Sequence, residues 1–320
     1  MDDNQNEIVY TPSNVSTLSI KAIEDRRNNP DGGVRCYIPT VDKVLKPCRG
    51  GELVTVMGRP SNYKSGFMQH WARHVAEDLK AGDSHEIVVY ITWEMAVEEL
   101  GVYDLAAALQ ISTEDLQDGR LDDATWERLQ AQAMKRATLP LWIIGHSLER
   151  RHKRPNLTLS NIAKALMWID EEMGVHPKIV FLDYLQLMQS EKGDERRMQI
   201  IENVHRSKDM AYHLGCPVVL GVQAGRQVDD RKWKLPEMGD GLESSSIEHA
   251  ADKMLSVWMP KQSEPVGSRV QIPGSGVYLD VTENLLICGV KKQRMGAANR
   301  LFPLYVDPTR NAIAPMAIGG

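Results

Sequence analysis

The sequence predicts an α/β fold with a mostly parallel central sheet, helices on both faces, and antiparallel strands added at one edge. Three observations support this prediction. Short β-rich runs alternate with helical stretches from Gly51 onward, as in parallel sheets whose crossovers are helices. A loop of phosphate-binding type joins the first run to the first helical stretch. Two further runs lie close together near the C-terminus, separated by a turn signal.

The order of the elements follows from these patterns. The β-rich runs occupy residues 53–57, 87–92, 141–144, 178–182, 218–222 and 254–259. The helical stretches between them occupy residues 64–80, 96–108, 122–137, 158–173 and 195–214. Residues 277–280 and 285–290 flank the turn signal Thr282-Glu283-Asn284, and we expect them to be the antiparallel strands at the edge.

Composition limits the class of protein. The chain has 320 residues, 42% hydrophobic and 25% charged, which indicates a packed core in one large domain or two small ones. No apolar run approaches the about 18 residues that span a bilayer, and the acidic N-terminus is unlike a secretory signal. The four cysteines are scattered, so we expect a reducing cytoplasm without a zinc site or disulfide framework. The net charge of −5 argues against a whole-surface nucleic-acid binder but allows a local basic channel.

We expect three segments along the chain. Residues 1–35 form a flexible N-terminal tail, disordered to about residue 15, with a helix over residues 17–29. Residues 36–310 form the main domain, and residues 311–320 form a C-terminal tail. The N-terminal helix is cut off by a Gly-rich link and is marginal alone. It is either a frayed tail or a helix that docks on a neighbouring subunit.

The phosphate-binding loop is the most informative motif. It follows the pattern G-x-x-x-x-G-K-[ST] over Gly58, Arg59, Pro60, Ser61, Asn62, Tyr63, Lys64 and Ser65. Backbone N–H groups of such a loop face phosphate oxygens, so Lys64 would reach the phosphates of ATP or another NTP and Ser65 would ligate Mg²⁺. Tyr63 replaces the second glycine, where positive φ penalises a Cβ. The loop therefore needs support from the rest of the chain.

Two β-rich runs end in carboxylates suited to nucleotide chemistry. Asp183 directly follows the β-rich run of residues 178–182 and would hold Mg²⁺. The signal is weak in isolation, because many buried strands end in Asp. Glu94 follows residues 87–92 and would orient or deprotonate the attacking water. Its alternative role is that of an acid at the N-terminus of the next helix, where it suits the helix dipole.

Polar residues follow two other β-rich runs. Gln223 directly follows the β-rich run of residues 218–222. It is either a sensor of the γ-phosphate or a plain loop residue. Lys292 and Arg294, two apart after the last run, either supply an arginine-finger contact from an adjacent subunit or form a solvated basic edge. The basic loop Arg150–Arg154 either binds phosphate backbones or is merely solvated, and the long polar segment 227–248 could reach a central ligand.

Together these segments resemble the ATPase domain of DnaB-family replicative DNA helicases, within the RecA-like fold of P-loop NTPases. The resemblance runs from about Tyr37 to Tyr305. Segments similar to five family motifs occur in order at residues 58–65, 92–95, 183–187, 247–252 and 292–296. The first two follow the family's A-R-P-S-M-G-K-T and Ser-x-Glu-Met, and the last three match Asp-Tyr-Leu-Gln-Leu, Ile-Glu-x-x-Ala-Asp and Lys-Gln-Arg-x-Gly.

The resemblance implies a ring-shaped homohexamer that translocates 5′→3′ on single-stranded DNA by hydrolysing nucleotide at subunit interfaces. It implies that Asp183 binds the metal, Glu94 the water, and that Gln223 is the sensor. It implies that Lys292 and Arg294 act on the neighbour's nucleotide, and that the helix over residues 17–29 packs on the next subunit. Loader or other replisome proteins are further partners of such a ring.

The chain departs from the family pattern at several points. We expect the chain to lack the family's N-terminal domain, which contacts primase, and therefore expect no primase coupling. The family run Arg-Glu-Ser-Gly-Ser, which touches the DNA backbone, is replaced by Leu242-Glu243-Ser244-Ser245-Ser246, which weakens that inferred contact. The Arg150–Arg154 loop resembles an insertion, and Tyr63 breaks the glycine pattern.

The leading interpretation is a minimal DnaB-like DNA helicase of a phage or plasmid replication system. The alternative is a RecA-like oligomeric ATPase without unwinding activity, which is recombinase-like, loader-like or signalling; Leu242 and the missing domain motivate it. A third interpretation, prompted by Tyr63, is a structural subunit that binds nucleotide without turning it over.

Overall fold

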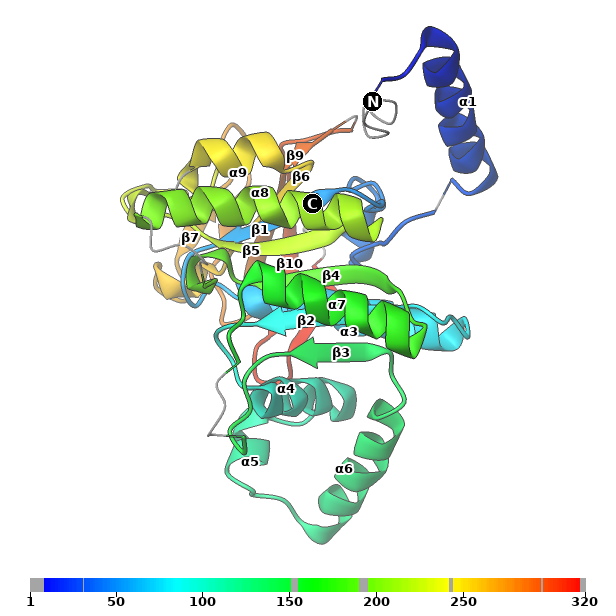
Figure 1. Ribbon diagram of the computed structural model, residues 1–320. Coiled ribbons are helices and arrows are strands. Elements are labelled where there is room, and N and C mark those ends of the chain that lie inside the picture. The colour runs from blue at the N-terminus through cyan, green and yellow to red at the C-terminus, as the bar shows by residue number, and fades with distance from the viewer. Residues whose placement is uncertain are drawn as a thin grey trace. The chain divides into compact units, whose positions relative to one another are not determined.

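The computed structural model describes residues 9–30, 32–150, 155–189, 195–241, 244–294 and 296–316 (Figure 1). The chain divides into two compact units, residues 1–33 and residues 34–320. In its described part the first unit is one helix, and the second unit is built around a nine-stranded sheet.

Helix α1 (Pro12–Asn28) forms the first unit. It begins early because Thr11 caps it: the Thr11 hydroxyl accepts the Asn14 N–H at 3.2 Å, and the Asn14 side-chain oxygen accepts the Thr11 N–H at 3.1 Å. The expected disorder up to residue 15 is therefore wrong from Pro12 onward, and residues 1–8 lie outside the described range. No side chain of α1 is buried, and its large apolar residues are each more than half exposed: Val15, Leu18, Ile20 and Ile23.

The sheet of the second unit has the strand order β11-β10-β9-β6-β1-β5-β4-β2-β3. The strands are β1 (Leu53–Gly58), β2 (Ile87–Thr92), β3 (Leu141–Ile144), β4 (Pro177–Asp183), β5 (Val218–Gln223), β6 (Lys253–Trp258), β9 (Leu285–Gln293), β10 (Arg300–Asp307) and β11 (Ala312–Pro315). The first six pair in parallel, and β9, β10 and β11 are antiparallel. All six β-rich runs predicted from the sequence are these parallel strands.

Helices cover both faces of the sheet. Because strand side chains alternate, Val54 and Val56 of β1 pack in one core cluster with α3 (Lys64–Ala81). Leu53 and Met57 pack in the other, with α7 (Leu159–Met173) and α8 (Arg196–Leu214), which lie in front of the sheet in Figure 1. Further helices are α2 (Pro39–Asp42), α4 (Val97–Leu109), α5 (Thr113–Gln117), α6 (Asp123–Arg136) and α9 (Ser244–Ala250).

Two expectations for the C-terminal region are wrong. β8 (Tyr278–Asp280) pairs with β7 (Arg269–Gln271) in a separate ribbon, because its inward side chain packs on a small core around Trp258 and not on the sheet edge. The expectation for residues 285–290 is confirmed, because they lie in β9, which forms the antiparallel edge together with β10 and β11. After the turn at Asn311, which has φ of 45°, the chain pairs with β10 and continues the sheet to Pro315, so residues 311–315 are not a tail.

No helix of the described residues is long and apolar enough to cross a membrane.

All four cysteines are free and buried, and burial raises their thiol pKa values, to about 12 for Cys48, Cys216 and Cys288. Such thiols serve as small apolar core groups and are poor nucleophiles.

Candidate functional site

A cavity of about 600 Å³ opens at the carboxyl ends of β1, β2, β4 and β5. The strand registers explain why distant segments meet there: Gly58 lies opposite Gln223, and Thr92 lies opposite Asp183. This edge is where ligands bind in open α/β sheets. The cavity is lined by Arg59, Pro60, Ser61, Tyr63, Lys64, Ser65, Gly66, Glu94, Met95, Glu99, Tyr103, Gln117, Tyr184 and Gln223.

The loop between β1 and α3 is fixed from both sides. The side-chain oxygen of Asn62 accepts the N–H of Met259, just after β6, at 2.8 Å. The guanidinium of Arg59 donates to both carboxylate oxygens of Asp229, at 3.0 and 2.6 Å, and to the carbonyl of Ala224 at 3.0 Å. The loop is thus bonded to the segment that follows β5 as well as to β6.

Tyr63 adopts the backbone conformation that a glycine would take at this position. Its φ is 64° and its ψ is 22°, in the left-handed region, and Ser61 also has a positive φ of 62°. The Tyr63 hydroxyl donates to Asn311 Oδ1 at 2.8 Å. The loop therefore has a left-handed turn at the second glycine position in spite of the side chain.

Lys64 begins α3 and faces the other charged groups of the cavity. Its Nζ lies 3.6 Å from the centroid of the Tyr184 ring, a cation–π contact. Burial lowers the pKa of Lys64, and the negative charges of Asp183 and Glu94 oppose that shift. One ammonium thus stands between an aromatic face and two carboxylates.

Asp183 lies fully buried at the end of β4. Its Oδ2 accepts the hydroxyl of Tyr90 at 2.8 Å, whereas Oδ1 has no hydrogen-bond partner among the described residues. A buried carboxylate oxygen without a donor is costly unless a cation or water satisfies it. Together with the hydroxyl of Ser65, which lines the cavity, Asp183 offers the hard oxygen atoms that suit Mg²⁺.

Glu94 projects into the cavity two residues beyond the end of β2. Burial raises its pKa, the charge of Asp183 raises it further, and Lys64 lowers it. No ion pair of the described residues engages Glu94 within 4 Å. A carboxylate with a raised pKa beside an open cavity is suited to accept a proton from a bound water.

Gln223 reaches the cavity while its main chain is clamped. The Gln223 N–H donates to the side-chain oxygen of Gln186 at 2.9 Å, and the Gln186 side-chain amide donates to the Gln223 carbonyl at 3.3 Å. Gln186 lies in the 3₁₀ turn η2 (Leu185–Leu187), which begins two residues after Asp183. The clamp fixes the ends of β4 and β5 to each other.

Sequence reasoning missed several lining residues. Glu99 and Tyr103 of α4 and Gln117 of α5 reach the cavity, as does Tyr184. The spacing of Glu99 and Tyr103 places both on one helix face, but only the packing of α4 shows that this face meets the loop.

Lys292 and Arg294 are not brought to this cavity. β9 runs antiparallel to β6, so Gln293 lies opposite Lys253 at the start of β6, at the other edge of the sheet. There the Lys292 ammonium donates to the carbonyl of Glu248, and its burial lowers its pKa. The Arg294 guanidinium contacts the Asp252 carboxylate at 3.2 Å and the carbonyl of His249 at 3.4 Å, and its side chain is 58% exposed.

The polar segment 227–248 is partly ordered by charge. Arg231 forms a bidentate pair with the buried Asp240, at 2.7 and 2.5 Å. Asp229 connects the same segment to the phosphate loop through Arg59.

Two of the segments singled out in the sequence lie at least partly outside the described residues. These are Leu242 and Glu243, and residues 151–154 of the basic loop.

Comparison with known proteins agrees with the motifs. Residues 33–307 match the family model of the DnaB-like helicase C terminal domain. A replicative DNA helicase DnaB from a Nostoc species is 30% identical over 216 residues, 67% of this chain and 23% of the relative. A DnaB from Helicobacter pylori is 31% identical over 226 residues, 69% of this chain and 43% of the relative. The chain thus spans less than half the length of these two curated relatives.

Solved structures show the same fold. An ATPase domain superposes with a TM-score of 0.76 at 20% identity, covering 94% of this chain and 98% of that chain. A DnaB-like replicative helicase, described with its interactions with primase, superposes with a TM-score of 0.75 at 20% identity, covering 94% of this chain and 66% of that chain. The RecA-like fold predicted from the sequence is confirmed, and because the family match covers residues 33–307, this chain belongs to the DnaB-like helicase C-terminal domain family.

Proposed function

We propose that the chain is a subunit of a ring-forming, ATP-dependent DNA helicase that translocates on single-stranded DNA in replication. The observation that carries the proposal is the cavity, which gathers the phosphate loop, Glu94 and Gln223, next to the buried Asp183, from four separate segments. The family relatives, which are named replicative DNA helicases, support the same conclusion. A phage or plasmid origin stays a prediction.

In this proposal the phosphates of ATP lie against the loop of residues 58–65. The free N–H groups at the start of α3 and the helix dipole favour phosphate oxygens. Lys64 leaves the face of Tyr184 and pairs with the β- and γ-phosphates. Ser65 and Asp183 hold Mg²⁺, which when bound neutralises charge on the phosphates.

Glu94 and Gln223 then act on the hydrolytic water. Glu94 orients the water and accepts its proton, for which its raised pKa is suited. Gln223 contacts the γ-phosphate or the water. Because Gln186 clamps the Gln223 main chain and Arg59 joins the loop to Asp229, a change at the phosphate is passed to the segment that follows β5.

Lys292 and Arg294 act on the nucleotide of the neighbouring subunit. Their position at the other edge of the sheet keeps them from the cavity of their own chain, which supports a role in trans. Arg294 is more than half exposed and is held in place by Asp252, so its guanidinium is available to a second copy.

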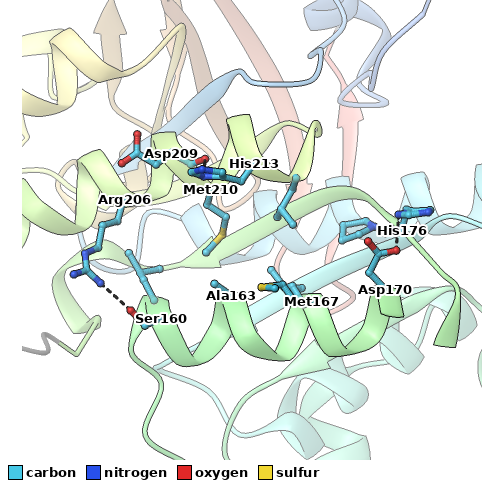
Figure 2. Close-up of a pocket in the computed structure, with 13 residues that line it drawn as sticks. Ser160, Ala163, Met167, Asp170, His176, Arg206, Asp209, Met210 and His213 are labelled. Carbon is cyan, nitrogen blue, oxygen red and sulfur yellow. Dashed lines mark hydrogen bonds and ion pairs between the residues drawn. The ribbon is translucent and has the colours of Figure 1, made fainter. Parts of the chain in front are cut away.

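The ring is held together by α1 and a groove on the next subunit. A groove of about 520 Å³ lies between α7 and α8 (Figure 2), with apolar side chains that include Ala163, Met167 and Met210. Asp170, Asp209 and Arg206 are among its charged lining residues, and the last turn of α1 carries Arg26 and Arg27, which could pair with the two aspartates. The apolar side chains of α1 are exposed in the single chain, and burying them in this groove of another copy would stabilise the helix.

ATP hydrolysis with and without single-stranded DNA, combined with strand displacement, tests the proposal. We expect hydrolysis that DNA stimulates, unwinding, and loss of both in Lys64→Ala. Hydrolysis indifferent to DNA and no unwinding would overturn the helicase function and favour the oligomeric ATPase that Leu242 prompts. Nucleotide binding without turnover would favour a structural subunit.

A further inference from the structure

Tyr63 is held in its left-handed conformation by its own side chain. The ring packs against the core cluster that includes α3, and burial raises the pKa of its hydroxyl, which therefore stays a neutral donor. The hydroxyl donates to Asn311 Oδ1 at 2.8 Å. A residue with a Cβ relaxes from a left-handed turn unless such contacts hold it.

Gly66 makes room for the Tyr63 ring. A Cβ added at Gly66 would lie 2.6 Å from Tyr63 Cζ and 2.7 Å from Cε2, well inside contact distance. Glycine is otherwise unfavourable within a helix relative to alanine, and Gly66 is the third residue of α3. The glycine absent from position 63 is thus matched by a glycine at position 66, against which the tyrosine ring lies.

Asn311 anchors the hydroxyl from the turn between β10 and β11. It is 1% exposed and bonds α3 twice more: its Nδ2 donates to Gln69 Oε1 at 3.0 Å, and its carbonyl accepts from Arg73 at 3.0 Å. The β10–β11 turn is therefore fixed to the phosphate-loop helix, and Tyr63 extends that connection into the loop itself.

We propose that Tyr63 is a positioning residue of the nucleotide site, with Gly66 and Asn311 as the two parts that hold it. Because Tyr63 directly precedes Lys64 and Ser65, its backbone angle sets the direction in which both face the cavity. The β10–β11 turn thus becomes part of the machinery that preorganises the phosphate loop. This inference rests on the proposed nucleotide-binding function of the loop.

Gly66→Ala in two backgrounds tests the first part. The readout is the Kd of a fluorescent ADP analogue with Mg²⁺, measured by anisotropy beside the thermal midpoint of each variant. With Tyr63 present, Gly66→Ala displaces the ring, and we expect binding at least about tenfold weaker. With Tyr63→Gly, which takes the left-handed turn freely, the same change should alter Kd less than about twofold. An equal loss in both backgrounds would overturn the role of Gly66 as space for Tyr63.

Tyr63→Phe and Asn311→Ala test the anchor while leaving the ring in place. Tyr63→Phe removes the hydrogen bond between the two side chains, and Asn311→Ala removes that bond together with the one from Asn311 Nδ2 to Gln69. We expect binding about fivefold weaker in each, with the double variant no weaker than the worse single one. Multiplicative losses in the double variant, or a loss of thermal midpoint with unchanged Kd, would show a merely structural contact and overturn the proposal.

Lys64→Ala separates failure of this inference from failure of the proposed function. If Lys64→Ala binds the analogue as well as the native chain does, the loop is not the nucleotide site and both fail. If Lys64→Ala abolishes binding while Gly66→Ala acts equally in both backgrounds, only the role of Tyr63 fails.

Discussion

At the scale of single residues, Glu94, which lines the cavity, and the buried Asp183 next to it have different surroundings that suit different proposed roles. Asp183 is fully buried and accepts from Tyr90, with one oxygen left for a cation. Glu94 is exposed at the cavity wall, and partial desolvation there and the charge of Asp183 raise its pKa. The first arrangement suits a group that would hold a cation, and the second suits a group that must exchange a proton.

Glu94→Gln should abolish turnover while leaving nucleotide binding intact. Removing a general base slows hydrolysis on the order of 10²- to 10⁴-fold, whereas the Kd of the fluorescent ADP analogue should stay within about twofold. Glu99→Gln, in the same cavity, is the matched control because it keeps an oxygen for the Ala96 N–H. Loss of turnover in the control with activity kept in Glu94→Gln would reverse the assignment.

The raised pKa of Glu94 also predicts two opposite pH effects. Since the base must be ionised, kcat should fall as pH falls through the raised pKa, at a higher pH than for an ordinary carboxylate.

The folded state binds the Glu94 proton more readily than the unfolded state does. The ionised group therefore lowers the free energy of unfolding above the folded-state pKa, and this penalty is absent below the unfolded-state pKa. Thermal midpoints should therefore show Glu94→Gln more stable than the native chain at pH 7.5, with the difference vanishing near about pH 4. A constant difference across this range would contradict the assignment.

At the scale of elements, the site is made where strands end and helices begin. β1, β2, β4 and β5 each deliver a polar group at the same edge, and α3 begins there, where the first N–H groups of a helix lack intrahelical partners. Helix α1 is different, because it has a cap at its start but no buried face. A helix with an unburied apolar set gains little stability alone, so the proposed docking on a neighbouring subunit would stabilise α1.

Leu18→Asp in α1 and Met167→Asp in the α7–α8 groove should each break the ring into smaller species. A charge placed in an apolar contact costs far more than the contact contributes. Mass measured by light scattering after gel filtration checks the result. Met134→Asp in α6 is the control, since Met134 is 76% exposed and lies outside the groove. An unchanged mass in both test variants would rule out this interface.

At the scale of the whole molecule, the strand order separates two sets of chemical groups. The cavity lies at the carboxyl edge of the parallel strands, and the antiparallel β9 returns Lys292 and Arg294 to the opposite edge. A single chain therefore carries the cavity and the pair Lys292 and Arg294 at opposite ends of the strands, which is compatible with the proposed action of this pair on the nucleotide of a neighbouring subunit.

Mixing Arg294→Ala subunits with Lys64→Ala subunits tests catalysis in trans. Each variant alone should lose ATP hydrolysis on the order of 10³-fold or more. Some interfaces of mixed rings combine a native Arg294 with a native Lys64, so partial activity should return, with a maximum at intermediate mixing ratios. Arg269→Ala, on the β7–β8 ribbon, is the control and should leave activity unchanged. Activity that Arg294→Ala alone retains would contradict a role for the guanidinium.

Much of the fold was predictable because its signals are local. Apolar runs of strand length alternate with helical stretches, and this determined the six parallel strands and the helices between them. The chemistry-bearing residues at the strand ends were also identifiable, because parallel strands bring their carboxyl ends to one edge. The start of α1 was misjudged because the reciprocal cap of Thr11 and Asn14 was not recognised.

Other features depended on contacts between residues distant in the sequence. The partner of β8 and the strand after Asn311 could not be read locally, because strand pairing is decided by which core each apolar face can join. The convergence of Tyr103 and Gln117 on the cavity depends on how α4 and α5 pack. The sequence by itself determined the layers of the fold and the residues at the strand ends. Only the tertiary structure decided that Tyr63 can take the place of a glycine, because the space at Gly66 and the anchor at Asn311 exist only after the chain has folded.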